Sequence, residues 1–283
     1  MITTNQLLGL EGKTVVVTGA GGVICSRIAE GLCEVGMNVM LLDIDEARAI
    51  EMASILKEKF PNVIIEGFFA NVLDKRSLES AKKRILSFVS AIDFIINGAG
   101  GNSPKATTQA EQIIPGQTDD LSDFFNLEMD GFDHVFNLNF KGTILPTMVF
   151  GKDLVERGEG GILNISSMNA FRPLTKIPAY SAAKSSINNF TQWLAVHFAK
   201  TGVRVNAIAP GFFVTTQNKF LLFDEKGNNT ERGQKIISGT PMGRYGEIEE
   251  LVGTTIFLLS DMSKFVTGIV VPIDGGFSAY SGV

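Results

Sequence analysis

The sequence predicts an α/β fold, a single Rossmann-type doubly wound parallel sheet of seven strands flanked by helices. Short β-branched apolar runs alternate with longer amphipathic stretches, which is typical of parallel strands buried on both faces and joined by helices. With 283 residues, 45% of them hydrophobic, the chain can form the core of one large domain spanning residues 1–283. A glycine-rich turn, TGAGG, directly follows the first apolar run and indicates a nucleotide site at the carboxyl end of the sheet.

Seven runs have the length and composition of strands, and six stretches between them have helical periodicity. We expect strands at 14–18, 38–42, 64–69, 93–97, 162–166, 204–209 and 270–273. We expect helices at about 26–35, 46–59, 74–89, 132–155, 181–200 and 247–259. Two segments, at about 98–131 and 211–246, are much longer than ordinary connections and follow strands on the ligand side. We therefore expect them to form substrate-side loops, against the alternative of tolerated surface insertions.

Charge and cysteine content narrow the class of ligand. The formal net charge is -5, the sequence pI is about 5.2, and no basic run is present, so nucleic acid and anionic membrane surfaces are not expected partners. Cys25 and Cys33 lack metal-ligand spacing, which predicts no metal site and two small buried residues in a reducing compartment. The sequence has no secretory signal pattern and no apolar run of membrane-spanning length, so we expect a cytoplasmic protein that acts on small molecules.

The first βα turn is the predicted nucleotide site. Gly19, Gly21 and Gly22 let the backbone approach a pyrophosphate at a helix N-terminus, although Ile24 breaks the strict G-x-G-x-x-G pattern. The second strand ends at Asp43, where a carboxylate can accept both ribose hydroxyls and repel a 2′-phosphate. This favours NAD over NADP; the alternative is that Asp43 only caps the next helix.

Two later strand ends extend this site. Asn71 and Val72 follow the third strand, where the Asn71 amide can bond an adenine. Asn97 ends the fourth strand and is followed by Ala99 and Gly100 in the run Asn97-Gly-Ala-Gly100, whose glycines permit close approach of a cofactor to the backbone.

Tyr180 and Lys184 place a phenol and an ammonium four positions apart where a helix is predicted to begin, so both side chains point the same way. A neighbouring Lys⁺ favours the phenolate and lowers the phenol pKa from about 10, which suits acid/base chemistry on a hydroxyl or carbonyl. Such pairs also occur by chance, as a snorkelling lysine beside a half-buried tyrosine. The pair alone leaves both interpretations open.

The ordered set of motifs resembles a short-chain dehydrogenase/reductase over nearly the whole sequence. The residues that carry this resemblance are the glycine turn, Asn97-Gly-Ala-Gly100, Asn139, Ser167, Tyr180, Lys184 and Pro210-Gly211. In that family the catalytic serine lies thirteen positions before the tyrosine, which selects Ser167 over Ser166, and Asn139-x-x-Gly favours Asn139 over Asn137.

The resemblance implies a role for each member of this catalytic group. Ser167 would hold the substrate oxygen and Tyr180 would exchange its proton. Lys184 would lower the pKa of Tyr180 and bind the ribose, and Asn139 would hold a relay water. The residues expected at the cofactor are Gly19, Gly21, Gly22, Val23, Ile24, Asp43, Asn71, Val72, Asn97, Ala99, Gly100, Tyr180, Lys184, Pro210, Gly211, Val214 and Thr215. Val23 and Cys25 stand where this family commonly has glycines.

The segment between Ser167 and Tyr180 must border the substrate, and its composition predicts a sugar acid. It carries an amide and two cations, and an arginine offers a bidentate fork to a carboxylate. The first long loop adds further polar groups at the same end. The residues expected at the substrate are Asn102, Lys105, Ser167, Asn169, Arg172, Lys176 and Tyr180. The alternative for each charge is that it faces solvent.

Within this family, a closer similarity is to the D-mannonate oxidoreductases, also called fructuronate reductases. It rests on TGAGGVICS, NGAGGN, SSMNAFRPLTK and QWLAVHF, and on the ending DGGFSAYSGV. It implies reversible NADH-dependent reduction of D-fructuronate at C5 to D-mannonate in hexuronate catabolism, and a homotetramer. The alternatives are another sugar-acid or polyol dehydrogenase, such as a gluconate 5-dehydrogenase, and, more remotely, a non-catalytic NAD-binding regulator.

Overall fold

The computed structural model describes residues 7–116, 122–215 and 218–282, and these contain the predicted seven-stranded sheet. All neighbouring strands pair in parallel in the order β3-β2-β1-β4-β5-β6-β7. The strands are β1 (Thr14–Thr18), β2 (Asn38–Asp43), β3 (Ile65–Phe69), β4 (Phe94–Asn97), β5 (Gly160–Ile165), β6 (Val203–Pro210) and β7 (Val270–Ile273). The order reverses between β1 and β4, so a ligand crevice is expected at the carboxyl ends of these two strands.

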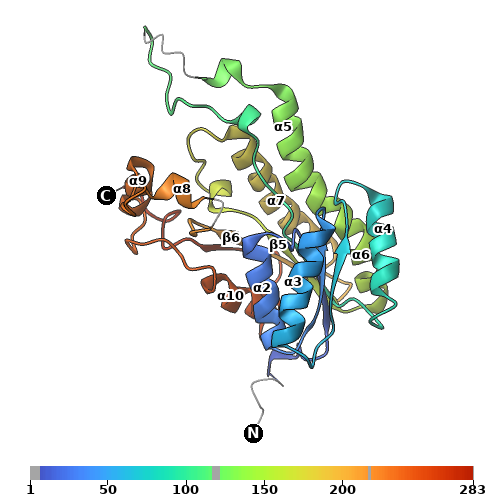
Figure 1. Ribbon diagram of the computed structural model, residues 1–283. Coiled ribbons are helices and arrows are strands. Elements are labelled where there is room, and N and C mark those ends of the chain that lie inside the picture. Colours follow the sequence, from blue (N-terminus) through green and yellow to red (C-terminus); the bar gives the residue numbers. More distant parts are fainter. Residues whose placement is uncertain (1–6, 117–121, 216–217, 283) are drawn as a thin grey trace.

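Helices cover both faces of the sheet, as Figure 1 shows. One face carries α2 (Val23–Glu34), α3 (Glu46–Lys59) and α10 (Glu250–Leu259). The other carries α4 (Lys75–Ile85), α6 (Gly142–Arg157) and α7 (Pro178–His197). The strand side chains alternate between the two cores: Val15 and Val17 of β1 pack on the first, and Val16 packs on the second. This two-sided burial is why the strands appear in the sequence as continuous apolar runs.

The predicted element boundaries hold within a few residues, and the differences have local causes. Helix α7 begins at Pro178, three residues before the expected start, because proline suits the first position of a helix. Helix α4 ends at Ile85 rather than near Val89. No helix in the described ranges is long and apolar enough to cross a membrane.

The predicted helix 132–155 is one helical run with a break in its hydrogen bonding. It consists of α5 (Met129–Phe136), a π-helical turn (Asn137–Lys141) and α6. Pro146 lies inside α6 and has no N–H to donate to the carbonyl of Gly142, which weakens the regular pattern next to the π turn. A single π turn inside an α-helix is often found at a functional site, and this one contains Asn139.

The described parts of both long loops lie at the carboxyl end of the sheet, and the second loop contains helices that the sequence did not predict. These are α8 (Lys219–Leu222) and α9 (Glu231–Ser238). Figure 1 shows the C-terminus beside α9, and Phe277 packs on Phe212 with ring centroids 5.2 Å apart. The C-terminal segment therefore packs against the start of the second long loop.

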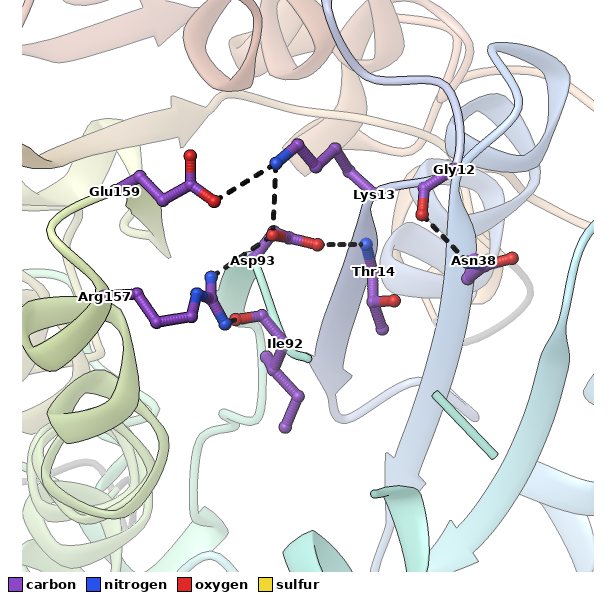
Figure 2. Close-up of polar contacts among 8 residues, drawn as sticks. All are labelled: Gly12, Lys13, Thr14, Asn38, Ile92, Asp93, Arg157 and Glu159. Atoms are coloured by element: carbon purple, nitrogen blue, oxygen red, sulfur yellow. Dashed lines mark hydrogen bonds and ion pairs between the residues drawn. The ribbon is translucent and has the colours of Figure 1, made fainter. Parts of the chain in front are cut away.

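At the opposite end of the sheet, the buried carboxylate of Asp93 joins several elements (Figure 2). It accepts a hydrogen bond from the Thr14 backbone at 2.7 Å and contacts Lys13 at 3.4 Å and Arg157 at 3.2 Å. Arg157 also donates to the carbonyl of Ile92 at 2.6 Å. A buried carboxylate is stable only when its lone pairs are satisfied in this way, so this cluster holds the amino ends of β1 and β4 together, away from the ligand crevice.

Candidate active site

The glycine turn lies where the strand order reverses. Gly19 follows β1 with φ +68°, and a Cβ there would approach the Cα of Ala99, after β4, to 2.8 Å. The two strand ends can therefore come this close only with glycine at this position. No side chain caps α2 at Gly22, so the first N–H groups of this helix, near Val23 and Ile24, remain for water or an anionic ligand.

Cys25 explains part of the departure from the usual glycine pattern. It is buried, and a Cβ at Gly98 would overlap its sulfur atom, so the thiol fills the space between α2 and the end of β4. Burial raises the pKa of the Cys25 thiol to about 12, and that of Cys33 to about 12 as well. Both cysteines are thus neutral, buried thiols, as the sequence predicts.

Asp43 faces the glycine turn and does not cap the next helix. Its Oδ2 accepts from the N–H of Gly21 at 2.9 Å, while the cap of α3 is Asp45, which accepts from Arg48. The alternative role considered for Asp43 is therefore filled by Asp45. The carboxylate of Asp43 stands at the edge of the turn, where a ribose would be bound.

The side chains of Asn71, Val72 and Asn97, which the sequence places on the nucleotide side, are all engaged in contacts within the protein. Asn71 forms a local turn, with its Oδ1 accepting from Leu73 N–H, and Val72 is buried against Gly142. The Asn97 side chain is turned into the core, where its amide donates to Thr147 and Asn164 at 2.9 Å each. Asn97 can therefore approach a cofactor only through its backbone.

Ser167 and Tyr180 form the polar centre of the site. Ser167 lies two residues after β5 and caps a 3₁₀ turn, and its hydroxyl forms a hydrogen bond with the side chain of Tyr180. Ser166 is turned the other way and donates to the carbonyl of Lys184 and to Asn188. The structure thus brings Ser167, rather than its neighbour, to the tyrosine.

Lys184 is buried beside Tyr180 but does not lower the phenol pKa in this structure. Its Nζ donates to the carbonyl of Ile165 at 2.8 Å and lies 5.6 Å from the centroid of the Tyr180 ring. Burial raises the pKa of Tyr180, a shift that the Ser167 hydrogen bond only reduces, and burial lowers the pKa of Lys184 to about 8. In the cofactor-free protein the pKa of Tyr180 is therefore raised, in contrast to the lowering expected from the Tyr180–Lys184 spacing, because spacing reveals the neighbouring lysine but not the loss of solvent.

Asn139 completes this group from the π turn. Its side-chain amide donates to the carbonyls of Gly101 at 2.7 Å and Val135 at 2.8 Å, and its Oδ1 accepts from Gly101 N–H at 3.3 Å. A Cβ at Gly100 would lie 2.6 Å from this Oδ1 and 3.3 Å from the Lys184 Nζ. Asn139 therefore fastens the start of the first long loop over the buried lysine.

The polar residues expected at the substrate are only partly brought together. Asn169 is buried next to Ser167, and its Oδ1 has no hydrogen-bond partner among the described residues. Arg172 is exposed. Asn102 donates to Thr107 on the surface, and the ammonium of Lys105 is held by Glu128 at 2.9 Å and Asp130 at 2.7 Å. These two carboxylates already neutralise Lys105, so the structure does not bring its charge to the substrate side.

A cavity of about 170 Å³ lies between the two long loops and the C-terminal segment. Its lining includes Lys176 from the predicted set, and it also contains residues that the sequence did not indicate. These are Glu111, Leu174, Thr175, Phe212, Arg232, Lys235, Ile236 and Phe277. Their only sequence signal was membership of the two long loops, of the segment before Tyr180 or, for Phe277, of the C-terminal motif.

The end of β6 leads into this region. Pro210 is buried at the strand end, and a Cβ at Gly211 would lie 2.6 Å from the Cα of Asp274. Val214 and Thr215 follow half-buried, with Thr215 N–H donating to Asn218 at 2.8 Å. Among the described residues, no group of three His, Cys, Asp or Glu side chains could hold a metal ion.

Known proteins resemble this one in sequence and fold over nearly the whole length of the sequence. A family model described as enoyl-(acyl carrier protein) reductase, one of the short-chain dehydrogenase/reductase models, matches residues 19–278. The protein belongs to the short-chain dehydrogenase/reductase family. It is 50% identical over 280 residues to the Bacillus subtilis protein named uncharacterized oxidoreductase UxuB, covering 97% of this chain and 98% of the relative.

Two further comparisons concern sugar acids. The solved structure of a Haemophilus influenzae protein, named as a candidate D-mannonate oxidoreductase and containing NAD, matches with a TM-score of 0.92 at 49% identity, covering 97% of this chain and 98% of that one. The 2-dehydro-3-deoxy-D-gluconate 5-dehydrogenase of Bacillus subtilis is 31% identical, with 96% and 97% of the two chains covered. The resemblance to this family that the sequence motifs indicated is confirmed, and the protein is an oxidoreductase.

Proposed function

We propose that this short-chain dehydrogenase/reductase is an NAD-dependent D-mannonate oxidoreductase that reversibly reduces D-fructuronate to D-mannonate at C5. The observation that carries the proposal is the Haemophilus influenzae structure, which contains NAD. It is 49% identical to this protein over nearly the whole length of both chains and has the same fold. The glycine turn, the uncapped N-terminus of α2 and the Asp43 carboxylate suit such a dinucleotide.

The residues of the site can carry out the proton-transfer half of this reaction. Bound NADH supplies the hydride to the C5 carbon. The Ser167 hydroxyl holds the C5 oxygen, and Tyr180 Oη donates its proton to that oxygen; in the oxidation, Tyr180 Oη takes the proton back. Burial keeps the phenol protonated in the free enzyme, which is the form that reduction needs. Lys184, held by Ile165, places an ammonium beside the ring.

Asn169 supports a hydroxylated substrate. A buried amide oxygen without a partner costs roughly 1–3 kcal/mol, and a substrate hydroxyl that donates to this oxygen would recover that cost. Sugar acids carry several such hydroxyl groups. An apolar acyl group would leave the oxygen unsatisfied.

The function is tested by following NADH oxidation with fructuronate, tagaturonate, 5-ketogluconate and fructose. We expect the highest kcat/KM with fructuronate and D-mannonate as its product. The relative at 31% identity favours a second candidate, a dehydrogenase of another sugar acid such as gluconate 5-dehydrogenase. A higher kcat/KM with 5-ketogluconate would replace the first proposal by the second, and no turnover of any keto acid would contradict both.

The carboxylate of Asp43 is expected to determine the choice of cofactor. In Asp43→Ser, the hydrogen bond to Gly21 and the negative charge at the ribose are both lost. We expect kcat/KM for NADH to fall by about tenfold, or roughly 1.4 kcal/mol. The ratio of kcat/KM for NADH to kcat/KM for NADPH should fall by more than about tenfold, because the repulsion of a 2′-phosphate is also lost. Kinetics with both cofactors measure the change, with Asp45→Ser as the control that makes the same substitution at the cap of α3. An unchanged preference would place the ribose elsewhere.

We also propose that the protein is a homotetramer. The outer face of α6 and α7 has an apolar groove of about 600 Å³ that includes Met148 and Trp193, exposed by 60% and 57%. A large exposed apolar face of this kind is typical of an interface between subunits. Sedimentation velocity over a range of concentrations tests this state, and a monomer throughout would contradict it.

A further inference from the structure

The cavity between the two long loops combines an apolar wall with a group of cations. Phe212 and Phe277 form the apolar side, with their rings in edge contact. Lys176, Arg232 and Lys235 contribute three positive charges to the same lining. At about 170 Å³ the cavity is smaller than a typical pocket for a whole ligand, so it fits one end of an anionic molecule.

A carboxylate of the protein already stands among these cations. Glu111 lies 3.9 Å from the Nζ of Lys176 and 3.4 Å from the Nζ of Lys235, and Lys235 also pairs with Glu231 on its own helix at 3.1 Å. It is 45% exposed, so these ion pairs are weak and open to exchange with another carboxylate. No ion pair of Arg232 is found among the described residues, so its guanidinium is available for a bidentate contact.

Lys176 links this cavity to the catalytic group. It lies four positions before Tyr180 and, at φ +74°, is the only non-glycine residue with a positive φ in the described part of the protein. Its carbonyl accepts from Thr108 N–H at 2.8 Å, which ties the first long loop to the segment that ends in the catalytic tyrosine. A strained backbone of this kind is kept where the surrounding structure requires one orientation of the residue, and here its side chain points toward Glu111.

We propose that Lys176, Arg232 and Lys235 form the subsite for the substrate carboxylate, and that Glu111 occupies this subsite until the substrate replaces it. The inference rests on the proposed function, since it names the residues that would recognise the acid group of a sugar acid. It assigns the carboxylate contact to Arg232 of α9, instead of Arg172, the arginine that the sequence favoured. It also makes Glu111 a determinant of specificity, because only an anion can displace it from two lysines.

The test measures binding to the NADH-loaded protein, which cannot oxidise an alcohol, by calorimetry, with D-mannonate and D-gluconate as acids and mannitol and sorbitol as their neutral counterparts. In Arg232→Gln we expect binding of the better acid to weaken by about tenfold, with the polyols unchanged. In Glu111→Gln we expect acid binding to tighten by about two- to fivefold, since the competing carboxylate is gone. Arg76→Gln on α4 removes the same charge from a distant exposed position and is the matched control.

Several results would overturn the subsite. The first is equal affinity of the parent protein for acids and polyols. The second is a loss of acid affinity in Arg232→Gln that is no larger than the loss in Arg76→Gln. The third is a loss of affinity in Arg232→Gln that is the same for the acid and the polyol. Acid-specific weakening in Arg172→Gln but not in Arg232→Gln would move the carboxylate to Arg172. Weaker acid binding in Glu111→Gln would make Glu111 a support for the lysines rather than a competitor. The turnover assay separates this inference from the proposed function, because binding can follow the expected pattern even if fructuronate is not reduced.

Discussion

Tyr180→Phe is expected to reduce turnover by about 10²- to 10⁴-fold, which is the usual contribution of a positioned acid/base group. The substitution removes the only proton that the ring can donate and leaves the half-buried ring in place. The affinity for NADH should change little, because the glycine turn and Asp43 are untouched. Single-turnover hydride transfer and NADH fluorescence titration measure the two quantities separately.

Tyr245→Phe is the control for this experiment. It also removes one phenolic hydroxyl, which donates to Asn229 in the second long loop at 3.1 Å. We expect its turnover to stay within a few-fold of the parent enzyme. Similar turnover in the two variants would exclude Tyr180 as the proton donor.

Those parts of the molecule that depend on local sequence could be predicted. Seven strands were recognisable because burial on both faces makes each one a continuous apolar run, as in β1. The cofactor end was recognisable because the turn after β1 and the acid at the end of β2 lie at a characteristic separation. Tyr180 and Lys184 share one helix face, so their proximity follows from helix geometry alone.

The remaining features depend on how distant segments pack. Glu111 and Lys235 are 124 positions apart, and no periodicity in either long loop predicts that they meet. The π turn around Asn139 shifts the backbone hydrogen bonds without changing which side chains are apolar, so it leaves no clear pattern in the sequence. The direction of the Tyr180 pKa shift required the extent of burial, which spacing does not contain.

Lys184→Met is expected to abolish most turnover and, at the same time, to change how stability depends on pH. In the folded protein Lys184 loses its proton near pH 8, whereas a lysine in the unfolded protein loses it near 10.5. Below pH 8 both states are protonated, and the folded state carries the full cost of the buried ammonium. Between these values the unfolded state binds more protons, so the free energy of unfolding of the parent protein must rise with pH.

The variant lacks this group, so its free energy of unfolding should not show that rise. Relative to Lys184→Met, the parent should gain about 1.4 kcal/mol per pH unit, roughly 3 kcal/mol in total, between pH 8 and 10.5. Denaturant unfolding of the cofactor-free proteins across this range measures the difference, with Lys75→Met, at an exposed lysine of α4, as the control. A difference that stays constant with pH would mean that Lys184 titrates normally.

The lowered pKa of Lys184 also shows that its buried ammonium has a cost in folding free energy, which must be offset by a function. At neutral pH the charge lowers stability, and its hydrogen bond to Ile165 offsets only part of that cost. A methionine of similar length would fill the same space without a charge to bury, although it would leave the Ile165 carbonyl without this donor. Retaining lysine is favourable only if its ammonium is used when the cofactor and substrate are bound. A variant that resists denaturant better at pH 7 while losing turnover would therefore show stability given up for catalysis.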